Sequence, residues 1–337
     1  SEGGDGVMRR RAVLAGWMMA AVAWTGAGVA VLPPPVRAGA AGIQLTIAGG
    51  SLGGVYYPLA VGIAEVVSKN VPGVTATPQV TEASTQNVVL AGTGEVDIAI
   101  ATAGDLYKAS LGEQPFPRKF TNLSVWFGGL RPGAVQVVVR RDSPIRTLAD
   151  LRGKRVSLGP RGGGGLQAFL ELMPAYGLRL SDLRASYVSY QESADQLGDG
   201  NLDAAVIVAA TPTPAVTQLA STTPVRLVPV ERDRLERFLQ EHPYYVAVTV
   251  PRTTYNGMDQ DVLTFATVNL AIIRDDLSEE LVYQMTRAIF ENLPQLHAVH
   301  AAVRAINLDS ATAFKGFRYH PGAARYFREV GRPVPTQ

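Results

Sequence analysis

A glycine-rich turn between an apolar run and an amphipathic pattern constrains the fold of this chain more than any other feature. Residues 43–47 form a short β-branched run, typical of a buried strand, and a helical pattern begins near Tyr56. The turn between them reads Gly-Gly-Ser-Leu-Gly-Gly (49–54). A helix N-terminus offers free N–H groups, and glycine lets a ligand approach the backbone. The turn predicts an anion-binding cradle, although a tight chain reversal alone would also explain it. Its spacing fits neither a dinucleotide-binding fingerprint nor a Walker loop.

The first 40 residues have the parts of a secretory signal peptide. Three arginines (9–11) precede an uncharged stretch (12–32), three prolines and a small-residue segment (38–41). We therefore expect export to the periplasm with cleavage near Ala40. Retention as an anchor is the alternative, because the uncharged stretch is long enough to span a bilayer. Residues 1–7 precede Met8 and are interpreted as lying upstream of the natural start or as left from cloning.

Charge and cysteine content narrow the class of protein. The chain has 31 Lys and Arg against 29 Asp and Glu, and the leader holds two more basic than acidic residues, so the remainder is balanced. No basic run survives outside the leader, and we expect no nucleic-acid partner. Cysteine is absent, so core burial must stabilise the fold. The four histidines are dispersed without a metal-ligand pattern, so we expect no bound metal. We also expect no cofactor, and we expect the protein to be a monomer.

Strand and helix patterns alternate along most of the chain, which predicts an α/β fold with largely parallel sheets. A second glycine-rich turn (159–165) lies about 110 residues after the first. Because ligands bind beyond the carboxyl ends of such strands, the two turns predict two lobes facing across a cleft. Strands at 135–140 and 268–274 are expected to cross between the lobes as hinges that permit closure. Residues 41–130 and 267–337 would form lobe I, and residues 131–266 lobe II.

Six ordered blocks of sequence resemble the TAXI solute-binding proteins of TRAP (tripartite ATP-independent periplasmic) transporters. The blocks are AGGSLGGVYYPLA (48–60), TEASTQNVVLAGTGEVDIAI (81–100), LRGKRVSLGPRGGGG (151–165), VAATPTPAVTQLA (208–220), HPYYVAVTVPRTTYNGMDQDVLTFA (242–266) and YHPGAARYFREVG (319–331). The resemblance implies a two-lobed type II periplasmic-binding-protein fold with two hinge strands. It also implies capture of a small organic anion, such as a carboxylate like glutamate or 2-oxoglutarate, and its delivery to a TRAP membrane permease driven by an ion gradient.

The candidate ligand-binding residues follow from the two turns and from this resemblance. They are Ser51, Gly53, Gly54, Tyr56, Tyr57, Ser84, Thr85, Asn87, Thr102, Asp105, Arg161, Gly162, Gly163, Gly164 and Thr211, with Arg131 and Gln136 as second choices. Two departures from the family pattern concern the ligand. Residues 102–105 read Thr-Ala-Gly-Asp instead of a Gln-Ser/Asn-Asp run, and the second turn has Arg161 and four glycines instead of a terminal hydroxyl.

Individual residues among these have competing interpretations. Arg161 can bind a carboxylate bidentately or can face solvent. Asp105 would repel an anion unless it meets an ammonium group, and it can instead cap the next helix. Tyr56 is the better ligand candidate of the tyrosine pair.

A transport receptor is the leading functional prediction. The alternative is a periplasmic ligand-sensing module for a membrane signalling protein, which would use the same pocket without a permease. An enzyme is not expected, because the sequence contains no nucleophile elbow, zinc-protease motif or cysteine–histidine pair.

Overall fold

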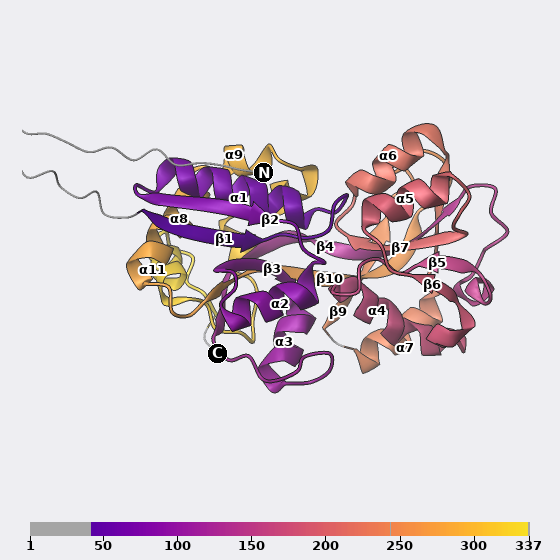
Figure 1. Ribbon diagram of the computed structural model, residues 1–337, viewed down its shortest axis with the longest axis horizontal. Helices are drawn as coiled ribbons and strands as arrows, with labels where there is room; N and C mark the ends of the chain where they lie inside the picture. Colours follow the sequence, from indigo (N-terminus) through magenta and orange to yellow (C-terminus); the bar gives the residue numbers. More distant parts are fainter. Residues whose placement is uncertain (1–41, 243, 336–337) are drawn as a thin grey trace, which may run out of the picture. The chain divides into compact units, whose positions relative to one another are not determined.

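Two similar arrays of parallel strands, joined by two long antiparallel strands, make one ten-stranded sheet (Figure 1). The computed structural model describes residues 42–242 and 244–335. In the first array β1 (Ile43–Ala48) lies between β2 (Val74–Gln79) and β3 (Ile98–Thr102). In the second array β5 (Arg155–Ser157) lies between β6 (Arg184–Ser186) and β7 (Ala204–Ala209). We call the elements around β1–β3 the first half and those around β5–β7 the second half.

The two long strands connect the halves. β4 (Leu123–Arg140) pairs with β7 and with the short β8 (Val225–Val228), while β10 (Val262–Arg274) pairs with β3 and with β9 (Tyr245–Val250). β4 and β10 also pair with each other, with register shifts between Thr267 and Ile272. The strands β4 and β10 therefore belong to the sheet of both halves. The predicted segments 135–140 and 268–274 are the last parts of these two strands: 135–140 pairs with β7 and β8, and 268–274 pairs with β3 and the start of β4. The crossing between the halves therefore lies in the earlier part of each strand, and β4 begins twelve residues earlier than predicted.

Helices connect the strands and cover the sheet. They are α1 (Tyr56–Asn70), α2 (Ser84–Thr93), α3 (Ala103–Leu111), α4 (Gly164–Leu172), α5 (Tyr190–Gly198), α6 (Pro214–Thr222), α7 (Arg232–Glu241), α8 (Glu279–Glu291), α9 (Leu293–His297), α10 (Leu308–Ala311) and α11 (Pro321–Glu329). Short 3₁₀ turns cover Leu148–Leu151, Met173–Tyr176, Leu180–Asp182 and Ala301–Ala305. Within residues 42–335, residue 243 apart, no helix is both long and apolar enough to cross a bilayer.

Alternating side chains of the second-half strands feed two separate core clusters. On β7, Ala205 and Ile207 pack into a cluster that includes α5 and α6 and continues through the first half. Val206, one position along, packs on the opposite face with α4 and α7. This alternation follows from the two-residue period of a strand. The α/β class is therefore confirmed by two buried faces, each covered by helices.

One expectation from the sequence needs correction. The sheet is mixed rather than largely parallel, because β4, β8, β9 and β10 all pair antiparallel. Helix α4 tightens into a 3₁₀ turn after Leu172, where Pro174 removes a backbone donor. Between α10 and α11, residues 312–320 are not helical.

Two predictions about organisation stay predictions. The described residues belong to one compact unit, so the lobe boundaries at 130/131 and 266/267 are not marked by a loss of contacts. The predicted signal peptide, residues 1–40, lies outside the described residues.

Candidate functional site

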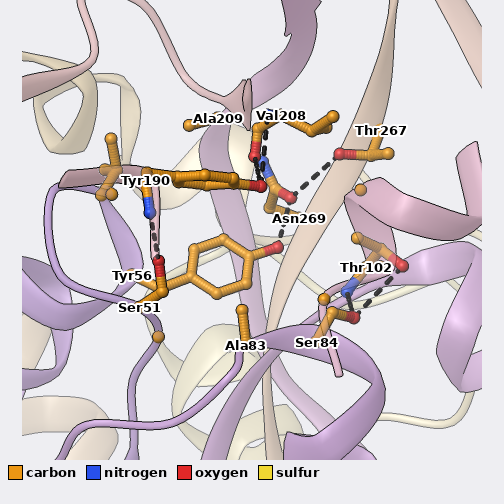
Figure 2. Close-up of a pocket in the computed structure, with 16 residues that line it drawn as sticks. Ser51, Tyr56, Ala83, Ser84, Thr102, Tyr190, Val208, Ala209, Thr267 and Asn269 are labelled. Atoms are coloured by element: carbon orange, nitrogen blue, oxygen red, sulfur yellow. Dashed lines mark hydrogen bonds between the residues drawn. The ribbon is translucent and has the colours of Figure 1, made fainter. Parts of the chain in front are cut away.

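Residues at the start of five helices line one cavity, and Figure 2 shows the side chains around it. The first residues of α1, α2, α4 and α5 line it, as does the N-cap residue of α3, Thr102. The full lining is Gly50, Ser51, Gly54, Val55, Tyr56, Ala83, Ser84, Thr102, Gly163, Gly164, Gly165, Tyr190, Val208, Ala209, Thr267 and Asn269. None of these residues is charged. The helix N-termini direct the positive ends of their backbone dipoles toward the cavity.

Several backbone donors at these helix ends have no acceptor. Helices α1, α2 and α4 lack a side-chain cap and have no acidic residue in the first turn. Within the described part of the chain, the N–H groups of Tyr56, Ser84 and Gly164 have no hydrogen-bond partner. Buried backbone donors are almost always paired. An anion in the cavity would supply the missing acceptors.

One wall of the cavity is a hydrogen-bonded network built on β10, whose residues Asn269 and Thr267 are labelled in Figure 2. The Tyr56 hydroxyl donates to Asn269 Oδ1 at 2.5 Å, and Asn269 Nδ2 donates to the Arg131 carbonyl at 3.0 Å. Thr267 Oγ1 also approaches Asn269 Oδ1, at 3.4 Å. Burial raises the pKa of Tyr56 well above its usual value, and Asp105 and Tyr190 add to the effect. Tyr56 is therefore a neutral wall residue whose proton is already donated to Asn269.

Tyr190 closes the side formed by the second half. Its hydroxyl donates to the Val208 carbonyl at 3.1 Å, and burial raises its pKa to about 12. Its backbone N–H donates to Ser51 Oγ at 3.4 Å. That bond joins the first glycine turn to the second half.

Other contacts between the halves hold the cavity shut. Gln191 N–H donates to the Leu52 carbonyl and Ala215 N–H to the Gly53 carbonyl, both at 3.1 Å. Gly53 adopts φ +82°, which only glycine reaches without strain. On the far side, Gln86 N–H donates to the Gly162 carbonyl at 3.0 Å. The cavity has about 440 Å³ of space free of protein atoms, its mouth included.

Hydroxyl groups organise the α2 and α3 ends of the cavity. Thr102 N–H donates to Ser84 Oγ at 2.8 Å, and Thr102 Oγ1 accepts from Asp105 N–H at 3.1 Å, which caps α3. Thr102, not Asp105, is thus the capping residue. Thr85 Oγ1 donates to Asp105 Oδ2 at 3.0 Å.

The structure brings seven of the predicted residues to the cavity wall: Ser51, Gly54, Tyr56, Ser84, Thr102, Gly163 and Gly164. Asp105 lines a smaller adjoining pocket, and Thr85 contacts it. Gly53, Tyr57, Gly162 and Thr211 lie outside the lining of both pockets. Asn87 is fully buried, and its amide donates to the Gly49 and Ile100 carbonyls at 2.6 and 2.7 Å. These two hydrogen bonds hold the first glycine turn against β3.

The arginine and glutamine candidates also lie away from the cavity. The Arg161 guanidinium is 3.8 Å from the centre of the Tyr187 ring, and its side chain is exposed. Arg131 is exposed and donates to the Thr211 carbonyl at 3.2 Å. Gln136 is fully buried and accepts from Tyr255 Oη at 2.7 Å. Contact between these side chains and a ligand stays a prediction.

Sequence reasoning missed Asn269, Thr267, Tyr190 and Ala83. The first two were signalled by polar residues in an otherwise apolar strand, since buried polar side chains need partners. Ala83 adopts φ +82° and ψ −146°, close to a region that only glycine occupies easily. No sequence signal distinguishes such an alanine. Among residues 42–242 and 244–335, no group of three or more His, Asp or Glu side chains could hold a metal ion.

Comparison with known protein families shows to which family this chain belongs. A model of the NMT1-like family matches residues 47–331. The chain belongs to the NMT1-like family. This family match covers both glycine turns and both long strands.

Individual relatives are more distant. A putative aliphatic sulfonates-binding protein of Escherichia coli K12 is 26% identical over 130 residues, which cover 38% of this chain and 36% of that protein. The match thus spans about a third of the length of that relative. Among solved structures, the alkanesulfonate-binding protein of Xanthomonas axonopodis pv. citri bound to MOPS has 16% identity and a TM-score of 0.49, covering 88% of this chain and 96% of the other. The periplasmic aliphatic sulphonate-binding protein of E. coli has 16% identity and a TM-score of 0.44, covering 86% and 90%.

Proposed function

We propose that this protein is an extracytoplasmic receptor that binds a small organic anion and delivers it to a membrane transporter. The carrying observation is the convergence of five helix N-termini on one uncharged cavity, three of which, those of α1, α2 and α4, have no side-chain cap. Each N-terminus carries roughly half a positive charge. Five of them favour an anionic carboxylate, sulfonate or phosphonate group without needing a lysine or arginine.

Closure of the two halves is the transport-relevant motion in this proposal. The bonds beside the cavity join the first glycine turn and α2 to the second half, so breaking them would let the halves separate around a ligand. β4 and β10 are the two strands that run between the halves, so bending at these strands would open the cavity. A receptor that presents one shape when empty and another when loaded gives a permease a basis for recognising the loaded form.

Ligand class is testable by thermal stability. A ligand at 100 times its dissociation constant adds about 2.7 kcal/mol to the free energy of unfolding. We expect carboxylates or sulfonates to raise the melting temperature, and isosteric amides and sugars to leave it unchanged. Stabilisation by cations or neutral solutes alone would contradict the proposal.

We further propose that the partner is a TRAP permease driven by an ion gradient. This proposal rests on the sequence resemblance to TAXI receptors. Uptake of the stabilising ligand into vesicles that contain the permease would test it. Uptake should require both this protein and a sodium or proton gradient. Uptake that depends on ATP instead would assign the receptor to a different transporter class.

A further inference from the structure

A further groove lies where the two halves meet, and it shares Ser51 with the main cavity. It contains about 730 Å³ of space free of protein atoms, open solvent included. Both halves contribute apolar side chains to its lining: Leu52 and Val80 from the first half, and Pro160, Tyr187 and Val188 from the second. We call the space between these five residues the seam groove.

Two side chains of the seam groove expose much apolar surface. Leu52 is 50% exposed and Val80 is 47% exposed. Leu52 belongs to the first glycine turn, which bonds to the second half through backbone atoms, since the Leu52 carbonyl accepts from Gln191 N–H at 3.1 Å. The contact between the halves therefore does not need a leucine side chain at this position. Exposed apolar side chains gathered around one groove are typical of a surface that another molecule covers.

Hydrogen bonds hold the two walls of the seam groove together. Gly162 N–H donates to Glu82 Oε2 at 2.8 Å, and Gln86 N–H donates to the Gly162 carbonyl at 3.0 Å. Each of these bonds, like the one between Gln191 and Leu52, joins a residue of the first half to a residue of the second. Because the walls belong to different halves, separation of the halves would divide the groove. Only the closed form presents it as one surface.

An arginine beside the seam groove has no acidic partner in the described part of the chain. The Arg161 guanidinium lies 3.8 Å from the centre of the Tyr187 ring, and Tyr187 lines the groove. No Asp or Glu oxygen of residues 42–242 and 244–335 comes within 4.0 Å of its nitrogens. Glu82, which also lines the groove, is bonded instead to Gly162 N–H. Stacking uses the face of the guanidinium and leaves N–H groups at its edge available to a carboxylate.

We propose that the seam groove is the surface by which the loaded receptor docks on its membrane permease. This inference rests on the proposed function and deepens it by naming the contact surface. The occupant is an extracytoplasmic segment of the permease that places an apolar side chain against Leu52 and Val80 and a carboxylate on Arg161. The unmatched positive charge of Arg161 favours an acidic segment. Because the groove is complete only in the closed form, the permease would bind the loaded receptor in preference to the empty one.

The absence of cysteine allows a single fluorescent label to test this contact. Leu52→Cys is labelled with a polarity-sensitive fluorophore and mixed with vesicles that contain the permease. The measurement is made with and without the organic acid that most raises the melting temperature of the protein. We expect a blue shift of the emission that requires both this acid and the permease. Leu180→Cys, which replaces an exposed leucine outside the groove, is the matched control and should not show the shift.

Charge substitutions test whether delivery needs the groove. Leu52→Glu and Val80→Glu should lower uptake into the permease vesicles about tenfold or more, while the dissociation constant of the same acid, measured by calorimetry, should change less than about twofold. Arg161→Glu should also lower uptake at a saturating concentration of the acid, and Arg161→Lys should retain part of it. Leu180→Glu and Arg232→Glu change exposed residues outside the groove and should retain uptake. The melting temperature of each variant shows whether it folds, and Leu52→Ala provides a milder truncation.

The outcomes separate this inference from the proposed function. Normal uptake by Leu52→Glu and Val80→Glu would place docking elsewhere and overturn the inference, while the receptor function stands. A loss of affinity for the acid as large as the loss of uptake would assign the groove to closure and overturn the inference too. So would a blue shift with lipid vesicles that lack the permease, or a dimer that Leu52→Glu abolishes in analytical ultracentrifugation, because the occupant would then be the membrane or a second copy. If no organic acid binds at all, the proposed function itself fails.

Discussion

The ion pair between Lys108 and Glu171 joins the two halves beside the cavity, and its removal should weaken ligand binding. Lys108 lies on α3 in the first half and Glu171 on α4 in the second. Their side chains are 15% and 19% exposed, and the lysine nitrogen is also 5.4 Å from the centre of the Tyr244 ring. Neither residue lines the main cavity, although Lys108 lines the smaller adjoining pocket. The pair joins the two halves, so its loss is expected to act on closure.

The magnitude follows from this environment. A charge-assisted hydrogen bond contributes about 1.5–3 kcal/mol, and partial exposure favours the lower end through solvent screening. The cation–π contact adds roughly 0.5 kcal/mol. Lys108→Met keeps the length of the apolar stem and removes about 2 kcal/mol from the closed state, which corresponds to a roughly 30-fold weaker affinity.

Calorimetry, stopped-flow dissociation and thermal unfolding together provide the assay. We expect a faster dissociation rate and little change in the melting temperature of the ligand-free protein, because an open form lacks the pair already. Arg155→Met is the matched control: it breaks the 2.7 Å pair with Asp203 inside the second half and should leave affinity unchanged. A double-mutant cycle with Glu171→Gln isolates the coupling.

One pattern would refute this reasoning. If Lys108→Met lowers the melting temperature of the empty protein and leaves affinity unchanged, the two halves form one rigid body and no closure step exists. The shut cavity would then need another route for its ligand.

Three further predictions test particular residues. Ala83→Gly should raise the free energy of unfolding by about 1 kcal/mol in a urea titration, because glycine relieves the strain of the positive φ. The control Ala91→Gly, inside α2, should lower the free energy of unfolding in the same titration. Gly164→Ala should weaken ligand binding about tenfold or more without lowering the melting temperature of the empty protein. The reason is that the new Cβ would lie 2.6 Å from Asp105 and 3.0 Å from Ser84, both in the first half. Unchanged affinity would argue against closure. Burial raises the pKa of Asp105 above 3.8, so the stability that its neutral form contributes is present below pH 3.8 and lost as pH rises through the raised pKa. Asp105→Asn should therefore flatten that part of the pH profile of unfolding and be more stable than the parent above it, and parallel profiles would contradict the assignment.

The sequence predicted local structure well where neighbouring residues decide it. The first strand, the first glycine turn and the helix after it follow from a β-branched run, six turn residues and a helical period, and the structure has β1 and α1 in those places. Predictions were poorer where long-range pairing decides. The mixed sheet could not be foreseen, because the direction in which β4 and β10 pair depends on segments more than a hundred residues apart.

In the candidate site, too, the residues set by local sequence were predicted and those set by long-range packing were not. Backbone at helix N-termini is specified locally, and seven predicted wall residues lie at the cavity. Arg161 had the right chemistry for an anion, yet its guanidinium stacks on Tyr187, a contact that depends on how two loops of the second half pack. Asn269 became a wall residue because β10 sets it opposite Thr102 and Leu130.

The sequence by itself determined that a glycine turn would precede a helix at two places, since the end of the strand, the turn and the start of the helix are encoded in adjacent residues. Tertiary structure alone decided that five helix N-termini meet at one cavity, that its lining is uncharged and that the buried Asp105 lies beside it. The physical reason is that electrostatic environment is a property of distances between elements. Residues far apart in the chain set those distances when the halves pack.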